Sequence, residues 1–146
     1  MKSSGPGNVR FFEVRDRVRW SDVDIAGIIY FGAYVRLIEL AETELLRELG
    51  FPYAEVFDKF NIWLPRVHLD FDFFKPAFMD DELLMRTQVV RVGTSSITLK
   101  TEVHNIRGAE IDAVASLVMA CVDRRTLKSR PLPAAFADPL RACAAL

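Results

Sequence analysis

The order of the elements predicted from the sequence indicates an α+β protein, in which one antiparallel sheet of about five strands wraps around a single long helix. In one segment alone, apolar residues recur over a long stretch with the period of a helix. Before and after that segment they alternate with polar residues, as they do in half-buried strands. A chain of 146 residues is long enough for one domain with a sizeable core and short for two.

Residues 10–20 predict the first strand, because apolar and charged side chains alternate there. The strand should therefore lie with one face on the core and the other in solvent. Asp16 is the one break in the apolar face. The remainder of that face consists of Phe12, Val14, Val18 and Trp20.

The long helix is predicted to begin after Gly32 and to run for about 17 residues, because Gly50 and Pro52 then end it. Its apolar stripe consists of Tyr34, Leu37, Ile38, Ala41, Leu45 and Leu49. Charged residues occupy the rest of the circumference, as expected for a helix that packs on one side.

Four more strands are predicted after this helix, because the alternation of apolar and polar residues returns at Ile62. The first of the four ends at Lys75 and Pro76, and its apolar face consists of Val67, Leu69, Phe71 and Phe73. The other three cover residues 82–92, 96–105 and 109–123, with loops of hairpin length between them. A short helix is expected before these strands, over residues 53–59.

The folded domain is expected to cover residues 10–127. Residues 1–9 are rich in Ser, Gly and Pro and are interpreted as a flexible leader. Residues 128–146 contain three prolines among many alanines, so we expect a tail with one or two helical turns.

Charge and composition argue against several classes of protein. A formal net charge of −1 gives no long-range attraction to nucleic acid. No apolar run reaches the roughly 18 to 20 residues that span a bilayer, and the N-terminus has no apolar signal-peptide core. The two cysteines, Cys121 and Cys143, lack CxxC spacing and are too few for a disulfide framework. A cytoplasmic protein that binds neither nucleic acid nor membrane is expected.

The most unusual stretch is residues 21–34, where Asp22 and Asp24 lie between the end of a strand and the start of the long helix. A carboxylate at this place meets backbone N–H groups, and the same groups can polarise a carbonyl oxygen. Such an arrangement suits acyl transfer. Asp is also a common turn residue, so the spacing alone leaves a purely structural role open.

Several motifs keep the order of a known family over residues 12–123. The run DVDIAGIIYFGAY resembles the signature DxDxxGxVxxxxY, and IELAETELL is similar to ExARTExL with Glu42 at the arginine position. The segment PAFMDDEL, followed by RVGTSSI, resembles a PAxxDDxL turn and the strand pair after it. Together these motifs resemble the 4-hydroxybenzoyl-CoA thioesterase family of hotdog proteins, including the acyl-CoA thioesterases associated with the Tol-Pal system.

The resemblance implies a hotdog fold and an enzyme that hydrolyses an acyl-CoA thioester to a carboxylic acid and CoA. Neither a metal nor an organic cofactor is implied. Asp24 matches the family's catalytic Asp, acting as nucleophile or as general base for water. The predicted oxyanion and acyl pocket consists of Gly27, Ile28, Tyr30, Phe31 and Tyr34. The predicted donors to CoA are Arg91, Ser95 and Ser96, for which a solvated turn is the alternative.

Two positions depart from the family pattern. Phe31 stands where the Tol-Pal-associated subgroup usually has a histidine, and Ala33 stands where a small polar residue is frequent. Both changes make the surroundings of Asp24 more apolar. The change at Phe31 removes the histidine that would assist Asp24. An aromatic or medium-length aliphatic acyl group would suit the apolar surroundings formed by Ile28, Ile29, Tyr30, Phe31 and Tyr34.

Other readings of the sequence remain open. A hotdog hydratase or dehydratase would need a histidine with a carboxylate, and His68 and His104 are the two histidines of the chain. His68 shares a strand face with Asp70 and Asp72, but no third metal ligand of suitable spacing is visible. A non-catalytic acyl-CoA binding protein is a further alternative.

The central helix offers another alternative, because a different class of hotdog thioesterases has its catalytic acid there. The candidates are Glu39, Glu42 and Glu44, which are expected to be exposed helix charges. Exposed sheet edges and an apolar outer face would need a cover, so we expect a homodimer or a homotetramer.

Overall fold

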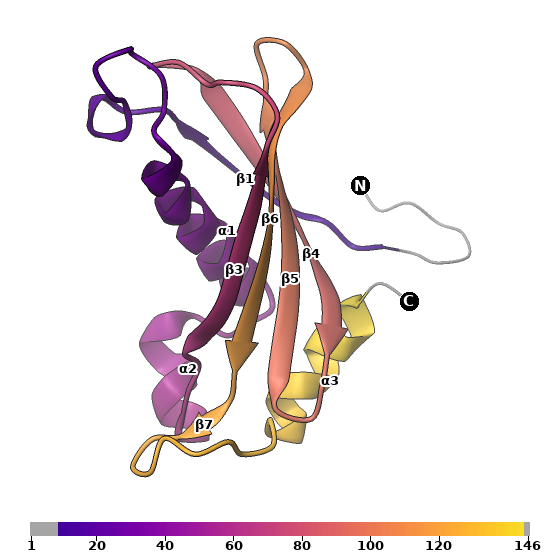
Figure 1. Cartoon of the computed structure of the whole chain (residues 1–146). Coiled ribbons are helices and arrows are strands. Elements are labelled where there is room, and N and C mark those ends of the chain that lie inside the picture. Colours follow the sequence, from indigo (N-terminus) through magenta and orange to yellow (C-terminus); the bar gives the residue numbers. More distant parts are fainter. Residues whose placement is uncertain (1–8, 145–146) are drawn as a thin grey trace.

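The computed structural model describes residues 9–144 and contains a five-stranded antiparallel sheet that curves around helix α1, Tyr34–Glu48 (Figure 1). In spatial order the strands are β1 (Phe12–Arg17), β4 (Glu82–Val92), β5 (Ser96–Asn105), β6 (Glu110–Ala120) and β3 (Arg66–Phe73). The predicted fold class and strand number are confirmed. Most of the expected leader lies outside the described residues.

Helix α1 packs its apolar stripe into the concave face of the sheet. Leu37 and Leu45 are completely buried. So are Leu83, Met85 and Val89 of strand β4. Each such side chain contributes roughly 1.5–3 kcal/mol when it leaves water. The helix is therefore held by packing against β1 and β4.

Strand β1 is shorter than its sequence pattern suggests. Trp20 was expected on the buried face, but its side chain is 83% exposed. The chain leaves the sheet after Val18, whose N–H donates to the Asp81 carbonyl oxygen, and turns into the short 3₁₀ helix η1, Trp20–Asp22. Alternation of residue types no longer determines which side chains are buried once the strand has ended.

Strand β3 is an edge of the sheet, because β6 pairs with it on one side. Its predicted apolar face points toward α1, yet this chain does not cover that face fully. Val67 is 60% exposed, Leu69 is 38% exposed and Phe73 is 50% exposed. An edge strand with exposed apolar side chains is the kind of surface on which a partner strand adds.

The smaller elements lie at the end of the sheet where β4 turns into β5. They are helix α2 (Tyr53–Phe60), the paired strands β2 (Ile62–Trp63) and β7 (Val122–Asp123), and helix α3 (Ala134–Cys143). α3 has ten residues, more than the one or two turns expected, and lies within the segment predicted as a tail. Its Phe136 and Leu140 are fully buried, so burial of an apolar face stabilises it despite Pro139.

Candidate active site

Asp24 lies in a tight turn between η1 and the 3₁₀ helix η2 (Phe31–Ala33) that precedes α1. Its carbonyl oxygen accepts a hydrogen bond from the Gly27 N–H at 2.9 Å, and its Oδ1 accepts one from the Ala26 N–H at 2.8 Å. Gly27 has a φ of 75°, a conformation that glycine adopts without steric cost. The carboxylate is exposed, and no side chain within residues 9–144 donates to it. The turn therefore fixes the backbone of Asp24 and leaves its carboxylate open to solvent.

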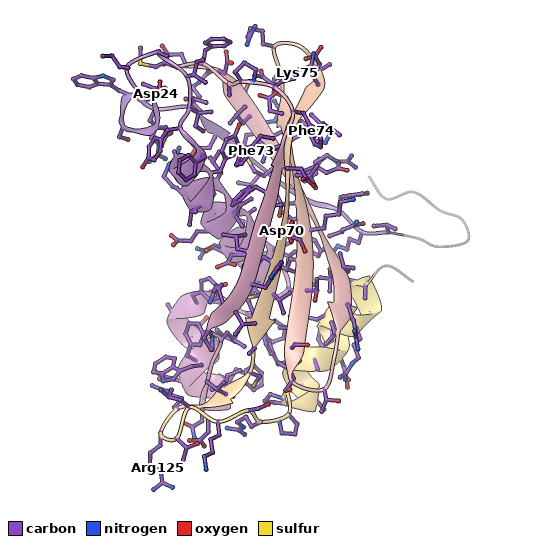
Figure 2. The ribbon with its side chains drawn as sticks, in the orientation of Figure 1. Asp24, Asp70, Phe73, Phe74, Lys75 and Arg125 are labelled. Atoms are coloured by element: carbon purple, nitrogen blue, oxygen red, sulfur yellow. The ribbon has the colours of Figure 1, made fainter. Side chains whose placement is uncertain are left out.

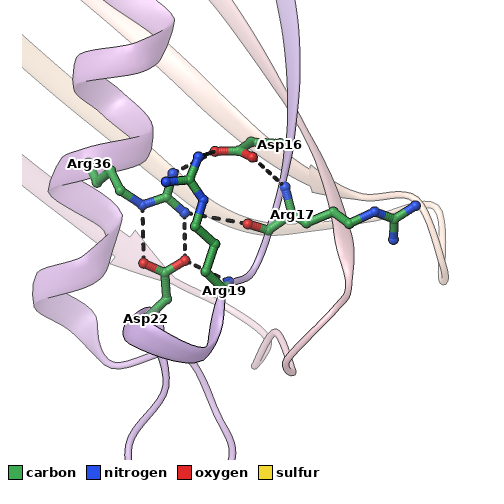
Figure 3. Close-up of polar contacts among 5 residues, drawn as sticks. All are labelled: Asp16, Arg17, Arg19, Asp22 and Arg36. Atoms are coloured by element: carbon green, nitrogen blue, oxygen red, sulfur yellow. Dashed lines mark hydrogen bonds and ion pairs between the residues drawn. The ribbon is translucent and has the colours of Figure 1, made fainter.

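Asp22, two residues earlier, is in the opposite situation (Figure 3). Its side chain is buried, and Arg36 of α1 binds both carboxylate oxygens, with Nε to Oδ1 at 3.1 Å and Nη2 to Oδ2 at 2.5 Å. The Arg19 N–H donates to Oδ2 at 2.8 Å. Burial alone would raise the pKa of Asp22, but these hydrogen bonds and the charge of Arg36 hold that pKa below its ordinary value. Asp22 is an anchor, not a reacting group.

Arg36 also connects Asp22 to strand β1. Its Nη1 donates to Oδ2 of Asp16 at 2.5 Å, and Arg19 Nη2 donates to the same oxygen at 3.1 Å (Figure 3). This explains why Asp16 breaks the apolar pattern of the first strand. The arginine joins the end of β1, the loop before Asp24 and the first turn of α1, so it fixes the frame in which Asp24 sits.

Backbone N–H groups are available at the start of η2. The Tyr30 N–H donates to the Asp22 carbonyl oxygen at 3.0 Å, so the predicted donor at Tyr30 is occupied. Within residues 9–144, the N–H groups of Phe31 and Gly32 donate to no backbone carbonyl. Two free N–H groups that follow one another at the start of a helix form a donor pair for an oxyanion.

An apolar cavity of about 290 Å³ opens beside η2, between the start of α1 and the segment that follows β3. Phe31 and Tyr34 line it, as predicted, together with Ile29, Phe73, Phe74, Lys75 and Pro76. Gly27, Ile28 and Tyr30 belong to the same loop without lining the cavity. Asp24 lies at the same end of the molecule as Phe74 and Lys75 (Figure 2). Hydrogen bonding of the Ile29 N–H to the Ala77 carbonyl oxygen fastens the Asp24 loop to that segment.

A family model described as the thioesterase-like superfamily matches residues 18–140, which include the Asp24 loop, the whole sheet except β1, and most of α3. The chain belongs to this superfamily. The family predicted from the motifs is thus confirmed, and the thioesterase class agrees with a site built from an exposed carboxylate and free N–H groups.

Several relatives match this chain over most of its length. The acyl-CoA thioester hydrolase YbgC of Escherichia coli O157:H7 is 27% identical over 86% of this chain and 92% of its own. The 1,4-dihydroxy-2-naphthoyl-CoA hydrolase of Synechococcus elongatus is 26% identical over 85% of this chain and 90% of its own. The structure of a DHNA-CoA thioesterase from Staphylococcus aureus aligns with a TM-score of 0.81 and 26% identity, covering 90% of this chain and 87% of that one. These matches confirm the hotdog thioesterase fold.

The predicted CoA donors lie at the other end of the thioesterase domain. Arg91, Ser95 and Ser96 flank the turn between β4 and β5, and β4 starts beside the Asp24 loop (Figure 1). A strand of 11 residues spans about 36 Å, so one protomer does not bring these donors to its own Asp24. Sequence reasoning missed a basic loop at the same end, which contains Arg124, Arg125, Lys128 and Arg130. Its signal was the charge run DRRTLKSR.

The two histidines are not part of the Asp24 site. His68 Nε2 lies 2.7 Å from Asp70 Oδ2, on the face of β3 opposite Leu69 and Phe71, and is well exposed. His104 Nε2 lies 2.9 Å from Glu102 Oε1. Within residues 9–144 no group of three metal-ligating side chains occurs. This placement gives no support to the hydratase alternative.

Glu42 departs from the expectation of an exposed helix charge. It is 4% exposed, and its Oε1 accepts hydrogen bonds from Arg66 Nη2 and from the Tyr53 hydroxyl, the latter at 3.1 Å. Burial raises the pKa of Glu42 above its ordinary value, although Arg66 and Tyr53 oppose that rise. The sequence pattern did not show this because the partners come from α2 and β3. Glu39 and Glu44 are more accessible, as expected.

Proposed function

We propose that this chain hydrolyses an acyl-CoA thioester at the Asp24 loop, giving a free carboxylic acid and CoA, without a metal or organic cofactor. Acyl-CoA thioester hydrolase is the class of its matched relatives and fits its superfamily. The observation that carries the assignment to Asp24 is the contrast within the DxD motif. Arg36 occupies both oxygens of Asp22, while Asp24 is exposed in the loop that leads to the free N–H groups of Phe31 and Gly32.

The geometry supports two routes that share one oxyanion site. In both, the thioester carbonyl oxygen accepts hydrogen bonds from the Phe31 and Gly32 N–H groups, which stabilise the developing negative charge. In the first, an Asp24 oxygen bonds to the carbonyl carbon, the C–S bond breaks, and water then hydrolyses the mixed anhydride. In the second, Asp24 takes a proton from the water that attacks the carbonyl. Either way the sulfur leaves as thiolate and is protonated to give CoA.

Replacing Asp24 by Asn tests this proposal. Asp24 is exposed, so the fold should persist, and we expect kcat for acyl-CoA hydrolysis to fall by at least about a hundredfold. Asp138→Asn, an exposed carboxylate of α3, is the matched control and should hydrolyse the substrates like wild type. Equal turnover by Asp24→Asn and wild type would refute the role of Asp24. Tight binding of acyl-CoA without release of CoA by wild type would indicate a binding protein instead.

The complete site requires a homodimer, formed by antiparallel pairing of β3 with the β3 of a second copy; a homotetramer would be two such dimers. The exposed Val67, Leu69 and Phe73 on this edge support it. In an antiparallel pair the Arg66 end of one strand lies beside the Phe73 end of the other. The end that carries the basic loop of one protomer thereby approaches the Asp24 end of its partner. A monomer at micromolar concentration in light scattering would contradict this assembly.

This assembly supplies the phosphate contacts of CoA from the partner. Arg124, Arg125, Lys128 and Arg130 form a basic loop, and the predicted donors Arg91, Ser95 and Ser96 lie at the same end. Arg125 extends from this end into solvent (Figure 2). We expect Arg125→Ala to raise KM for an acyl-CoA several-fold, because one contact to phosphate is lost. Hydrolysis of the corresponding acyl-pantetheine, which has no phosphate, should be unchanged.

A cytoplasmic location completes the proposal. Both cysteines are unpaired and buried in the structure, as suits a reducing compartment. No helix within residues 9–144 is long and apolar enough to cross a bilayer. Fractionation of cells that express the chain tests the location directly.

A further inference from the structure

A second cavity, of about 560 Å³, lies between α1, α2 and β3. This volume is within the roughly 300 to 1,000 Å³ that small-molecule sites occupy. Its walls are mainly apolar and include Val35, Ile38, Phe57, Leu69 and Leu117. The polar side chains of Glu42, Tyr53 and Arg66 gather at its α2 end. An apolar cavity with a few convergent polar groups is the general form of a ligand site.

Glu42 lines this cavity and has one carboxylate oxygen that no group in the described part of the chain bonds. Both side-chain hydrogen bonds to it, from Arg66 and Tyr53, end on Oε1, and within residues 9–144 none ends on Oε2. Yet the side chain is nine-tenths buried and lines the cavity wall. Within residues 9–144 no sealed side-chain oxygen lacks a partner, so Oε2 is open to the cavity, where a hydroxyl or N–H group of a ligand can donate to it in place of water.

The second cavity continues the line of the first along the same two elements. On α1, Tyr34 lines the first cavity and Glu42 the second, eight residues and about 12 Å further along the helix. On β3, Phe73 lines the first and Leu69 the second, four residues and about 13 Å apart on one face. Phe71 lies between them and stacks on Phe73. An acyl chain that ran from the first cavity along α1 and β3 would therefore reach Glu42 in the second.

We propose that the second cavity holds the distal part of the acyl group and that Glu42 Oε2 accepts a hydrogen bond from a hydroxyl group carried there. The substrate class is then a medium-length acyl-CoA with a hydroxyl near its far end. This inference rests on the proposed thioesterase function of Asp24. The charges favour a neutral donor over an anion, because Glu42 already pairs with Arg66 and Glu39 adds a second carboxylate at the wall.

Three substrates of equal length test the inference: decanoyl-CoA, its ω-hydroxy derivative and its ω-carboxy derivative. For wild type we expect kcat/KM to be about tenfold higher for the ω-hydroxy substrate than for decanoyl-CoA, the size of one hydrogen bond to a charged group. The ω-carboxy substrate should be the poorest of the three. A wild-type ratio near one between the first two would overturn the inference, whatever any variant does.

The variant Glu42→Gln should lose the preference for the ω-hydroxy substrate. The ratio of two kcat/KM values is the readout, because it does not depend on how much of the variant is folded. Glu44→Gln, which removes a carboxylate of the same helix that pairs with Arg47 outside the cavity, should keep the wild-type ratio. Retention of the ratio in Glu42→Gln would contradict the role of Glu42.

Failure of the proposed function would look different. Wild type would then hydrolyse none of the three substrates, or Asp24→Asn would hydrolyse them as well as wild type does. A series from butanoyl-CoA to decanoyl-CoA adds a check on the cavity itself. If side chains of a second protomer fill it, kcat/KM will stop rising at short chain length, and the inference is wrong.

Discussion

Two arginine–carboxylate sites lie along α1, and they differ in how many carboxylate oxygens the protein bonds. Near the start of the helix, Arg36 meets two aspartates, and every oxygen of Asp22 is bonded. Near its middle, Glu42 is deeply buried, and within residues 9–144 hydrogen bonds reach one of its oxygens alone. The first site has enough donors to overcome burial, so the pKa of Asp22 is lowered; in the second, burial prevails and the pKa of Glu42 is raised.

The difference separates a structural site from a binding site. A carboxylate whose oxygens are all bonded to the protein fixes a loop and is unable to accept more from a ligand. A carboxylate with one oxygen open to a cavity can still accept a hydrogen bond from a ligand there. We therefore expect changes at Arg36 to act on the fold and on Asp24 together, and changes at Glu42 to act on substrate choice.

The largest effect is expected for Arg36→Ala. It leaves Asp22 buried without its cation, which costs about 3–5 kcal/mol of unfolding free energy. Urea unfolding measures this loss, and kcat should also fall because the Asp24 loop loses its frame. Arg47→Ala, which breaks an exposed pair on the same helix, is the control and should cost less than about 1 kcal/mol. Similar losses for the two variants would contradict the anchoring role of Arg36.

A smaller effect is expected for Tyr53→Phe. The substitution keeps the ring that stacks on Phe57 but removes the hydroxyl that donates to Glu42 and accepts from Arg66. We expect a loss of about 1–3 kcal/mol in unfolding free energy, because the buried carboxylate has one donor fewer. Urea unfolding at neutral pH should detect it, while kcat for a short acyl-CoA stays near the wild-type value. No change in stability would show that this hydroxyl is replaced by water.

These sites also show how far sequence reasoning reached. The strands over residues 82–92 and 96–105 were predicted with the bounds that the structure has, because both alternate cleanly and one face of each is buried. Asp24 was chosen over Asp22 through its resemblance to a family motif; spacing alone did not separate them. The structure supplies the physical reason, which is the position of Arg36 in the first turn of α1, where it binds Asp22.

Features that depend on contacts distant in sequence were out of reach. The cluster of Glu42, Tyr53 and Arg66 joins three elements, and no local pattern shows that a glutamate on a charged helix face is covered. Helix α3 has weak local signals, since Pro139 lies inside it, and it forms because Phe136 fits against Phe51 with ring centroids 5.0 Å apart. In both cases tertiary packing overrides local propensity.

The two carboxylates should respond to pH with opposite sign. The pKa of Asp22 is lowered on folding from 3.8, so its contribution to stability is present above that value and lost as pH falls below it. The pKa of Glu42 is raised from 4.5, so stability is lost as pH rises above 4.5 through the folded value. The difference in unfolding free energy between wild type and Asp22→Asn should therefore grow as pH rises through 3.8. Between wild type and Glu42→Gln it should shrink as pH rises above 4.5. If both differences changed in the same direction with pH, the opposite pKa shifts of Asp22 and Glu42 would be contradicted.

The smallest loss of stability is expected for Gly27→Ala and Gly50→Ala. Comparing their kcat values tests whether the geometry of the Asp24 loop matters for activity. Gly27 and Gly50 both have positive φ, at 75° and 92°, and a Cβ added at either would meet no atom within 4 Å. Replacing either by Ala should thus cost a similar 1–2 kcal/mol, on the order of the strain of an L-residue in this conformation. Gly27 donates to the Asp24 carbonyl oxygen, whereas Gly50 ends α1 far along the chain. We expect Gly27→Ala alone to lower kcat, since relief of the strain would turn the Asp24 carboxylate away from the Phe31 and Gly32 N–H groups. Equal kcat for the two variants would mean that the turn tolerates the change and that Asp24 is positioned by Arg36 and Asp22 instead.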